Sequence, residues 1–226
     1  MTNSEQQIGR DLAELFRWDV RLEGASIRVH VDDTCVTLSG TAPSYEARMA
    51  AEACAWSVPD VSCVDNEVVV RPVDGYDAVR DDEIRLQVEG MLSGSAKLNG
   101  SRLVVSVKNG EIHLHGMVDA LWKKRLAEEL AAQARGVIRI SNRIGVAPGM
   151  VPEDKQIAAA LEEMLGKTNS REYRNVDVQV EFGIVTLSGA VPSWEAFSHA
   201  DSVAERTPGV LSIKNRLTIR PPEGRE

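Results

Sequence analysis

One unit is repeated three times along this chain of 226 residues, and the repetition limits the possible folds more than any other feature. Each copy has an apolar segment that ends in glycine, followed 26 residues later by an asparagine. The register between the copies holds without a gap from Ile8 to Val70, from Ile84 to Val146 and from Ile157 to Ile219. The chain is therefore predicted to contain three similar small domains. Their landmark residues are Gly40 and Asn66, Gly116 and Asn142, and Gly189 and Asn215.

Within each copy, the apolar residues first follow the period of a helix and then the period of a strand. In the first copy, Ile8 and Leu12 lie on one face of a helix. Val29 and Val31 then alternate with polar residues, as in a strand with one buried face. The second copy joins its alternating segments through Asn109-Gly110, a dipeptide typical of a two-residue hairpin turn. Each copy is therefore expected to begin with a helix and a β-hairpin.

An alanine-rich segment follows each glycine and leads to a third apolar strand. Ser44 and Ser193 stand where their side chains would cap the first turn of a helix, and Asp119 is near the equivalent place in the middle copy. These second helices are expected at about 45–57, 120–134 and 194–206.

The predicted fold class is α+β, with three tandem α-β-β-α-β domains. A strand–helix–strand connection is normally right-handed and makes its two strands parallel neighbours. Each domain is therefore expected to be a three-stranded mixed sheet with two helices on one face. The domains are placed at residues 1–72, 78–147 and 152–222.

Composition and charge argue against several classes of protein. Apolar residues make up 43% of the chain and charged residues 27%, as in soluble globular proteins. The net charge of −8 disfavours a nucleic-acid partner, which would require a basic surface. No apolar stretch approaches the ~20 residues of a membrane-spanning helix. No transmembrane segment and no nucleic-acid binding are therefore expected.

The cysteines and the N-terminus together predict a cytoplasmic protein. Cys35, Cys54 and Cys63 are an odd number without a C-x-x-C pair, which favours a reducing compartment over a disulfide framework. The first residues lack the basic and apolar regions of a signal peptide. Cys54 occupies an apolar position of the second helix and is expected in the core.

The motifs of the three copies resemble those of the BON domain. The resemblance rests on V-x-L-x-G before the second helix and on G-V-x-x-V-x-N-x-L-x-V after it. Residues 209–219 and 136–146 match the second motif well, whereas the first copy has Asp60 in place of the glycine. BON domains occur in osmotically induced bacterial proteins and in some outer-membrane proteins. The resemblance implies a non-enzymatic protein, with phospholipid binding in envelope stress as the usual proposal and the periplasm as the alternative localisation.

No catalytic site, cofactor or metal is expected. The recurring asparagines have no titrating group in the useful range and are poor general bases, so they are interpreted as structural, like the recurring glycines. No glycine-rich phosphate loop is present. His113 and His115 share one face of a predicted strand, but two imidazoles are fewer than the three or four ligands of a typical metal site.

The candidate lipid-binding site is Trp122, Lys123, Lys124 and Arg125, at the start of the second helix of the middle copy. An aromatic ring next to cations suits an anionic membrane surface, where each cation contributes about 1 kcal/mol. The middle copy, residues 73–148, has 11 basic and 10 acidic residues, whereas the first has 6 and 12 and the third 9 and 12. The alternative is a solvated helix face with Trp122 packed against a neighbouring copy.

Tyr45 and Trp194 stand at matching helix starts and are either surface anchors or packing residues at the core edge or between domains, with packing favoured. The predicted function is a non-catalytic, stress-associated binding protein. Its expected partner is an anionic phospholipid surface or an envelope or stress protein. The alternative is a soluble cytoplasmic adaptor whose three modules contact other proteins, with affinity increased by linkage.

Overall fold

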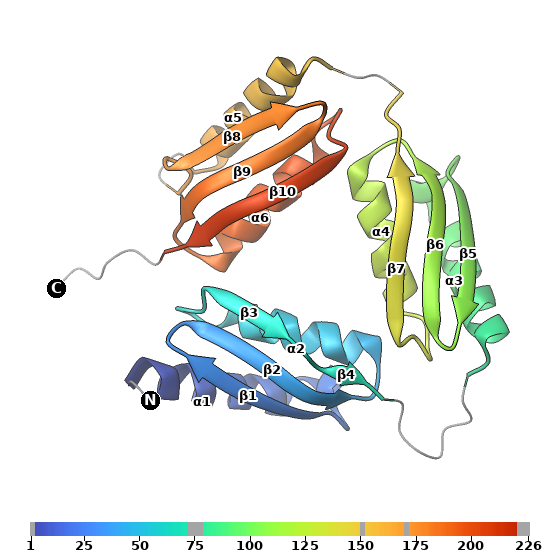
Figure 1. The fold of residues 1–226 in the computed structure, drawn as a ribbon, viewed down its shortest axis with the longest axis vertical. Coiled ribbons are helices and arrows are strands. Elements are labelled where there is room, and N and C mark those ends of the chain that lie inside the picture. The colour runs from blue at the N-terminus through green and yellow to red at the C-terminus, as the bar shows by residue number, and fades with distance from the viewer. Residues whose placement is uncertain (1–2, 72–78, 150–151, 170–171, 221–226) are drawn as a thin grey trace. The chain divides into compact units, whose positions relative to one another are not determined.

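The computed structural model describes residues 3–71, 79–149, 152–169 and 172–220, and these form three similar modules (Figure 1). The elements of the first module are α1 (Asn3–Trp18), the 3-10 helix η1 (Val20–Leu22), β1 (Ser26–Asp32), β2 (Cys35–Ala42), α2 (Tyr45–Ser57), β3 (Cys63–Asn66) and β4 (Val69–Val70).

The other two modules follow the same order, with a single third strand. The second contains α3 (Asp81–Gly94), the 3-10 helix η2 (Ala96–Leu98), β5 (Arg102–Lys108), β6 (Glu111–Val118), α4 (Leu121–Ala132) and β7 (Arg139–Val146). The third contains α5 (Asp154–Asn169), β8 (Val176–Glu181), β9 (Ile184–Val191), α6 (Trp194–Arg206) and β10 (Ser212–Ile219).

Each sheet is mixed, and its second strand lies in the middle. In the third module β8 and β9 are antiparallel, whereas β9 and β10 are parallel and paired over the whole length of β10. The first module has the same arrangement, with β3 and β4 successively paired to β2. Both helices of a module pack on the same face of its sheet (Figure 1). The predicted α+β fold, with three mixed three-stranded sheets, is confirmed.

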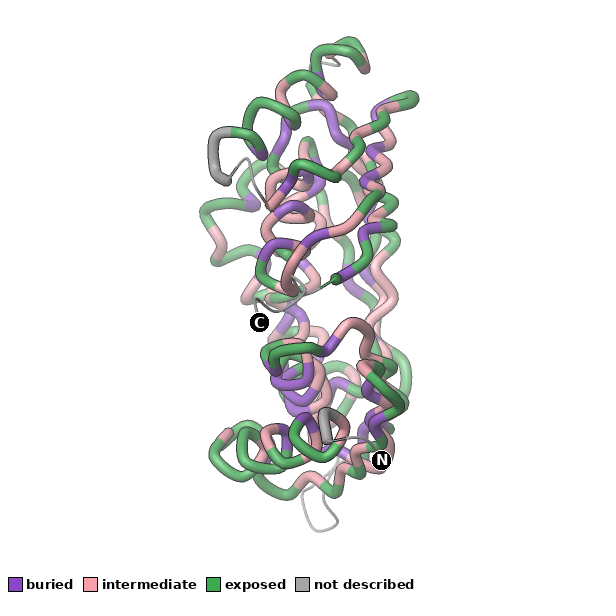
Figure 2. The backbone as a smooth tube through the Cα atoms, turned by 90° about the vertical axis from the view of Figure 1, so that its left-hand side faces the viewer, coloured by how far each residue is buried: buried purple, intermediate pink, exposed green. Residues whose placement is uncertain are grey.

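The core of each module lies between the sheet and its two helices. On β2, Val36 and Leu38 are fully buried, while Thr37 between them is only half-buried on the other face. This alternation of buried and half-buried residues runs along the strands in Figure 2. Ala47 and Ala51 of α2 are also fully buried, and small side chains at these positions let the helix pack closely on the strands.

The helix caps and hairpin turns have the predicted geometry in most places. Ser44 and Ser193 accept hydrogen bonds from the amides three residues later, at 3.0 and 3.2 Å. Asn109 and Gly110 have φ angles of 51° and 74°, as a type I′ turn requires. In the middle module, Asp119 forms an ion pair with Lys123 at 2.7 Å.

The recurring glycine is required by a close backbone contact inside each hairpin. Gly40, Gly116 and Gly189 have φ angles of 116°, 126° and 116°, which side-chain-bearing residues rarely adopt. A Cβ atom at Gly189 would overlap the carbonyl oxygen of Asn175 on the neighbouring strand, and the other two glycines meet the equivalent carbonyl. Only glycine fits this position without moving the hairpin.

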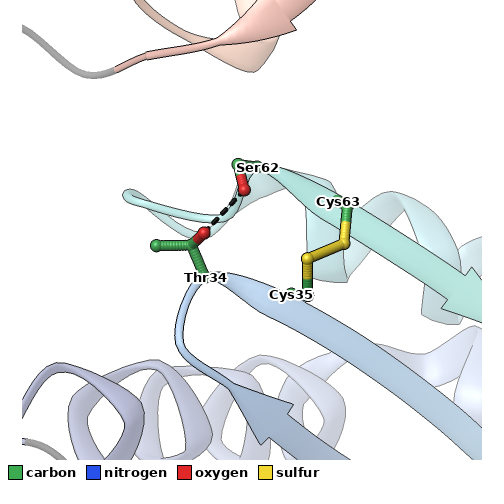
Figure 3. Close-up of a disulfide and its surroundings, with 4 residues drawn as sticks. All are labelled: Thr34, Cys35, Ser62 and Cys63. Carbon is green, nitrogen blue, oxygen red and sulfur yellow. Dashed lines mark hydrogen bonds between the residues drawn. A yellow bond between two sulfur atoms is a disulfide. The ribbon is translucent and has the colours of Figure 1, made fainter.

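The expectation of three unpaired cysteines is wrong. Cys35 and Cys63 form a disulfide between β2 and β3, with their Cα atoms 4.7 Å apart (Figure 3). The reason is the register of the parallel pair, which places these two residues directly opposite each other. Beside the disulfide, the hydroxyls of Thr34 and Ser62 are hydrogen-bonded at 2.6 Å. Cys54 is a buried free thiol in the core, as predicted.

We expect Gly189→Ala to lower the free energy of unfolding of the third module by about 2 kcal/mol or more, because the new methyl group displaces a strand carbonyl. Urea unfolding followed by circular dichroism measures this change. Gly166→Ala is the matched control, since its Cβ would meet nothing within 4 Å in α5. That control is expected to be neutral or stabilising, by up to ~1 kcal/mol. Equal effects of the two substitutions would contradict the close contact.

We expect only Cys54 to react with a thiol reagent when the oxidised protein is denatured without reductant, because Cys35 and Cys63 are bonded to each other. Mass spectrometry after alkylation counts the labels. Joint replacement of Cys35 and Cys63 by serine is expected to cost about 3.5 kcal/mol, the chain-entropy value for a loop of this length. Three labels on the oxidised protein would contradict the pairing.

Candidate functional site

The predicted lipid-binding residues lie together at the start of α4. The Lys123 ammonium is 5.6 Å from the centre of the Trp122 ring and 2.7 Å from a carboxylate oxygen of Asp119. This ion pair lowers the pKa of Asp119, chiefly through the hydrogen bond from Lys123. The side chain of Lys123 is only 15% exposed, and Trp122 is half-buried. Lys123 is therefore already neutralised by a neighbouring carboxylate.

Arg125 is also paired with carboxylates. Its guanidinium lies 2.5 Å from Asp201 and 3.1 Å from Glu205. At least two of the three cations of the run therefore have acidic partners, and an anionic surface would have to compete with those partners. The four residues are consecutive at the start of α4, and these ion pairs reduce the positive charge that they present.

The recurring asparagine joins the third strand to the second helix in each module. The Asn142 side-chain amide donates to Glu128 of α4 at 3.0 Å, and its oxygen accepts from the amide of Ile144 at 3.2 Å. Asn66 and Asn215 make the equivalent pair of bonds. We call this arrangement the asparagine clamp. Its acidic partners, Glu52, Glu128 and Asp201, all lie 12 residues after the landmark glycine.

A second recurring contact holds the tip of the hairpin. The carboxylate of Asp81, at the start of α3, accepts hydrogen bonds from the backbone amides of Asn109 and Gly110 at 2.8 and 2.9 Å. Asp154 holds the tip of the third hairpin in the same way, and Glu5 accepts a longer bond of 3.4 Å in the first. Sequence reasoning missed these acids, although they recur 35 residues before each landmark glycine.

The other aromatic candidates, Tyr45 and Trp194, are only partly exposed. Tyr45 is half-buried, and burial raises the pKa of its hydroxyl. Trp194 is half-buried and stacks on Phe197, with ring centres 4.9 Å apart. His113 is half-buried and His115 exposed. Among the described residues, no group of three or more His, Cys, Asp or Glu side chains is placed to hold a metal ion.

Two exposed apolar side chains of the first module were missed by the sequence reasoning. Trp18 ends α1 and is 77% exposed, and Val20 begins η1 and is 79% exposed. Between them, the carboxylate of Asp19 binds the Arg21 guanidinium at 2.6 Å, and this contact holds the pKa of Asp19 well below its usual range. The second module has Gly94 and Ala96 at these positions, so this exposed pair is not a property of the repeat.

No helix in the described parts of the chain is both long enough and apolar enough to cross a membrane.

Three copies of one small α+β module, each with the same glycine contact and asparagine clamp, define a tandem-repeat protein. The chain belongs to the BON domain family, whose model matches residues 4–72, 80–148 and 153–221.

Two curated relatives share part of the chain. This chain is 27% identical to Osmotically-inducible protein Y of Escherichia coli (strain K12) over 146 residues, which are 62% of this chain and 73% of that protein. It is 31% identical to the 21 kDa hemolysin of Actinobacillus pleuropneumoniae over 153 residues, 63% of this chain and 77% of that protein. Among solved structures, the C-terminal domain of CdsD, a type III secretion system protein of Chlamydia trachomatis, matches with a TM-score of 0.27 and 15% identity. That match covers 94% of this chain and 96% of the other.

We expect the asparagine clamp to show as a coupling energy between Asn142 and Glu128. A double-mutant cycle of Asn142→Ala and Glu128→Ala, followed by urea unfolding, should give a coupling of about 1 kcal/mol or more, because the hydrogen bond is to a charged group. Glu129→Ala is the matched control, since this neighbouring side chain is exposed. Strictly additive effects of Asn142→Ala and Glu128→Ala would contradict the clamp.

Proposed function

We propose that this chain is a non-catalytic, stress-associated binding protein whose target is the surface of a phospholipid membrane. The observation that supports this most is the exposure of Trp18 and Val20, which are separated in the chain only by Asp19. A tryptophan ring is suited to the level of the lipid headgroups, and a neighbouring aliphatic side chain adds apolar surface to bury. The relationship to Osmotically-inducible protein Y supports the association with stress.

The charges around Trp18 indicate which kind of membrane contact to expect. Arg17 and Arg21 are exposed, but Asp19 neutralises Arg21, and Glu14 and Glu23 are exposed nearby. The local charge therefore gives no strong attraction to anionic lipid. Burial of the two apolar side chains supplies the main contribution, at most about 4 kcal/mol, so the binding is weak and reversible.

The α4 run of Trp122, Lys123, Lys124 and Arg125 provides a second membrane contact. Because Lys123 and Arg125 are paired with carboxylates, its contribution is expected to be small and to appear only at low salt. The two segments thus differ in their expected dependence on lipid charge and ionic strength.

For localisation, we propose an oxidising compartment, the periplasm, instead of the cytoplasm that the sequence favours. The Cys35–Cys63 disulfide supports this choice, since such bonds persist in oxidising compartments and are rare in the cytosol. Alkylation of the protein directly in its own cells, followed by a count of the labels by mass spectrometry, tests the proposal.

We expect the full chain to float with both zwitterionic and anionic vesicles, with little change between low and physiological salt. Joint replacement of Trp18 by alanine and Val20 by serine should remove most of the binding, because it removes the exposed apolar surface. Val69→Ser, at a side chain of the same module that is 53% exposed, is the matched control and should leave binding unchanged. Trp122→Ala with Lys124→Glu should reduce only the low-salt binding to anionic vesicles.

Absence of flotation with every vesicle would contradict the membrane proposal. The alternative, an adaptor that binds proteins through its three modules, would then be favoured.

A further inference from the structure

Phe182 occupies a position that is unfavourable for it. It lies at the tip of the β8–β9 hairpin with a φ angle of 52°, and 89% of its surface is exposed. The first and second modules have Asp33 and Asn109 there, with φ angles of 55° and 51°, and these residue types tolerate the left-handed conformation. The phenylalanine therefore adds backbone strain and gains almost no burial within its own module.

The backbone of this tip is held firmly. Asp154 accepts hydrogen bonds from the amides of Phe182 and Gly183 at 2.7 and 2.9 Å. Gly183 is buried, whereas Phe182 projects from the turn. The structure thus presents one aromatic ring on a fixed support, which lowers the entropy lost when the ring enters a partner site.

The second module contains a groove of about 620 Å³ between α3, η2 and β5, with both apolar and polar residues in its lining. Leu86, Leu92, Leu98, Leu103 and Val105 supply most of its apolar lining. The exposed position of Leu86, at 60%, leaves part of this lining in contact with solvent.

Gly90 opens the groove on the α3 side. The equivalent residues of the other two modules are Glu14 and Glu163, so only the second module lacks a side chain there. A Cβ atom built on Gly90 would meet nothing within 4 Å outside its own helix. A larger residue therefore fits the fold, and the glycine is not required for packing within the module.

The charges near the groove and near the hairpin tip are complementary. Lys97 and Arg102 are exposed on either side of residues 99–101, which line the groove, and the one acidic residue of the lining, Glu89, is paired with Arg85 at 3.0 Å. Next to Phe182, the hairpin tip exposes Glu181.

We propose that Phe182 of one chain inserts into the α3–β5 groove of a second copy of this chain. The contact is heterologous, because the inserted residue and the groove belong to different modules, and repetition gives rings or open head-to-tail chains. The proposal does not depend on membrane binding, since the Trp18–Val20 surface takes no part in it.

Sedimentation of the full chain over a range of concentrations tests the proposal. The wild-type protein is expected to form dimers and larger species as its concentration rises. Phe182→Asn removes the inserted ring and restores the residue type of the second module, whereas Gly90→Glu fills the groove with the residue of the other two modules. Each substitution should raise the dissociation constant about 30-fold or more. Neither should lower the thermal midpoint, since the first relieves backbone strain and the second improves helix propensity.

A mixture of the two variants provides the sharpest control. The Phe182→Asn chain keeps its groove, and the Gly90→Glu chain keeps its phenylalanine, so together they should form a one-to-one complex that grows no further. A wild-type protein that remains monomeric at every concentration would overturn the proposal. Unchanged association of either folded variant, or a mixture that remains monomeric, would also overturn it.

Discussion

Each module depends on a contact between a glycine and a strand carbonyl inside its β-hairpin. At Gly40, Gly116 and Gly189 the backbone adopts a φ angle near 120°, and a Cβ atom would overlap the neighbouring strand. The central strand continues for two residues past the glycine and ends in a buried residue, and the chain then turns into the second helix. The asparagine clamp joins that helix to the third strand by the same two bonds in every module. These contacts explain how three divergent sequences keep one fold.

The modules differ at surface positions that take no part in these shared contacts. The first module has an exposed Trp18 and Val20 and a disulfide, the second has a groove beside Gly90, and the third has an exposed aromatic ring at its hairpin tip. None of these features is needed for its module to fold, because the other copies fold with different residues at the equivalent positions. Binding functions are therefore best sought at positions where the repeat is broken, and not at the residues that the copies share.

The repeat made the fold predictable from the sequence, whereas the surface was harder to predict. The recurring glycine, the recurring asparagine and the periodicity of the apolar residues were enough to predict the order of helices and strands, because each reflects a local requirement of the backbone. The Cys35–Cys63 bond depends on the register between two parallel strands, which the element order alone does not fix. The run at Trp122 was easy to find, but Asp119 and Asp201 neutralise cations of that run. The sequence did not indicate Phe182 as a binding residue. Its importance depends on the left-handed conformation of the turn and on the presence of Asn109 at the equivalent position of the second module.

Residue-resolved hydrogen exchange on the full chain tests the central claim most directly, namely that the same asparagine clamp holds all three modules together and that a carboxylate holds the hairpin tip in the second and third. The amides of Val68, Ile144 and Leu217, which donate to the clamp asparagines, should exchange as slowly as those of the central strands. The tip amides of Gly110 and Gly183, which donate to Asp81 and Asp154, should be protected as well. Exchange of these amides at the rate of an unfolded chain, while the central strands remain protected, would contradict the account.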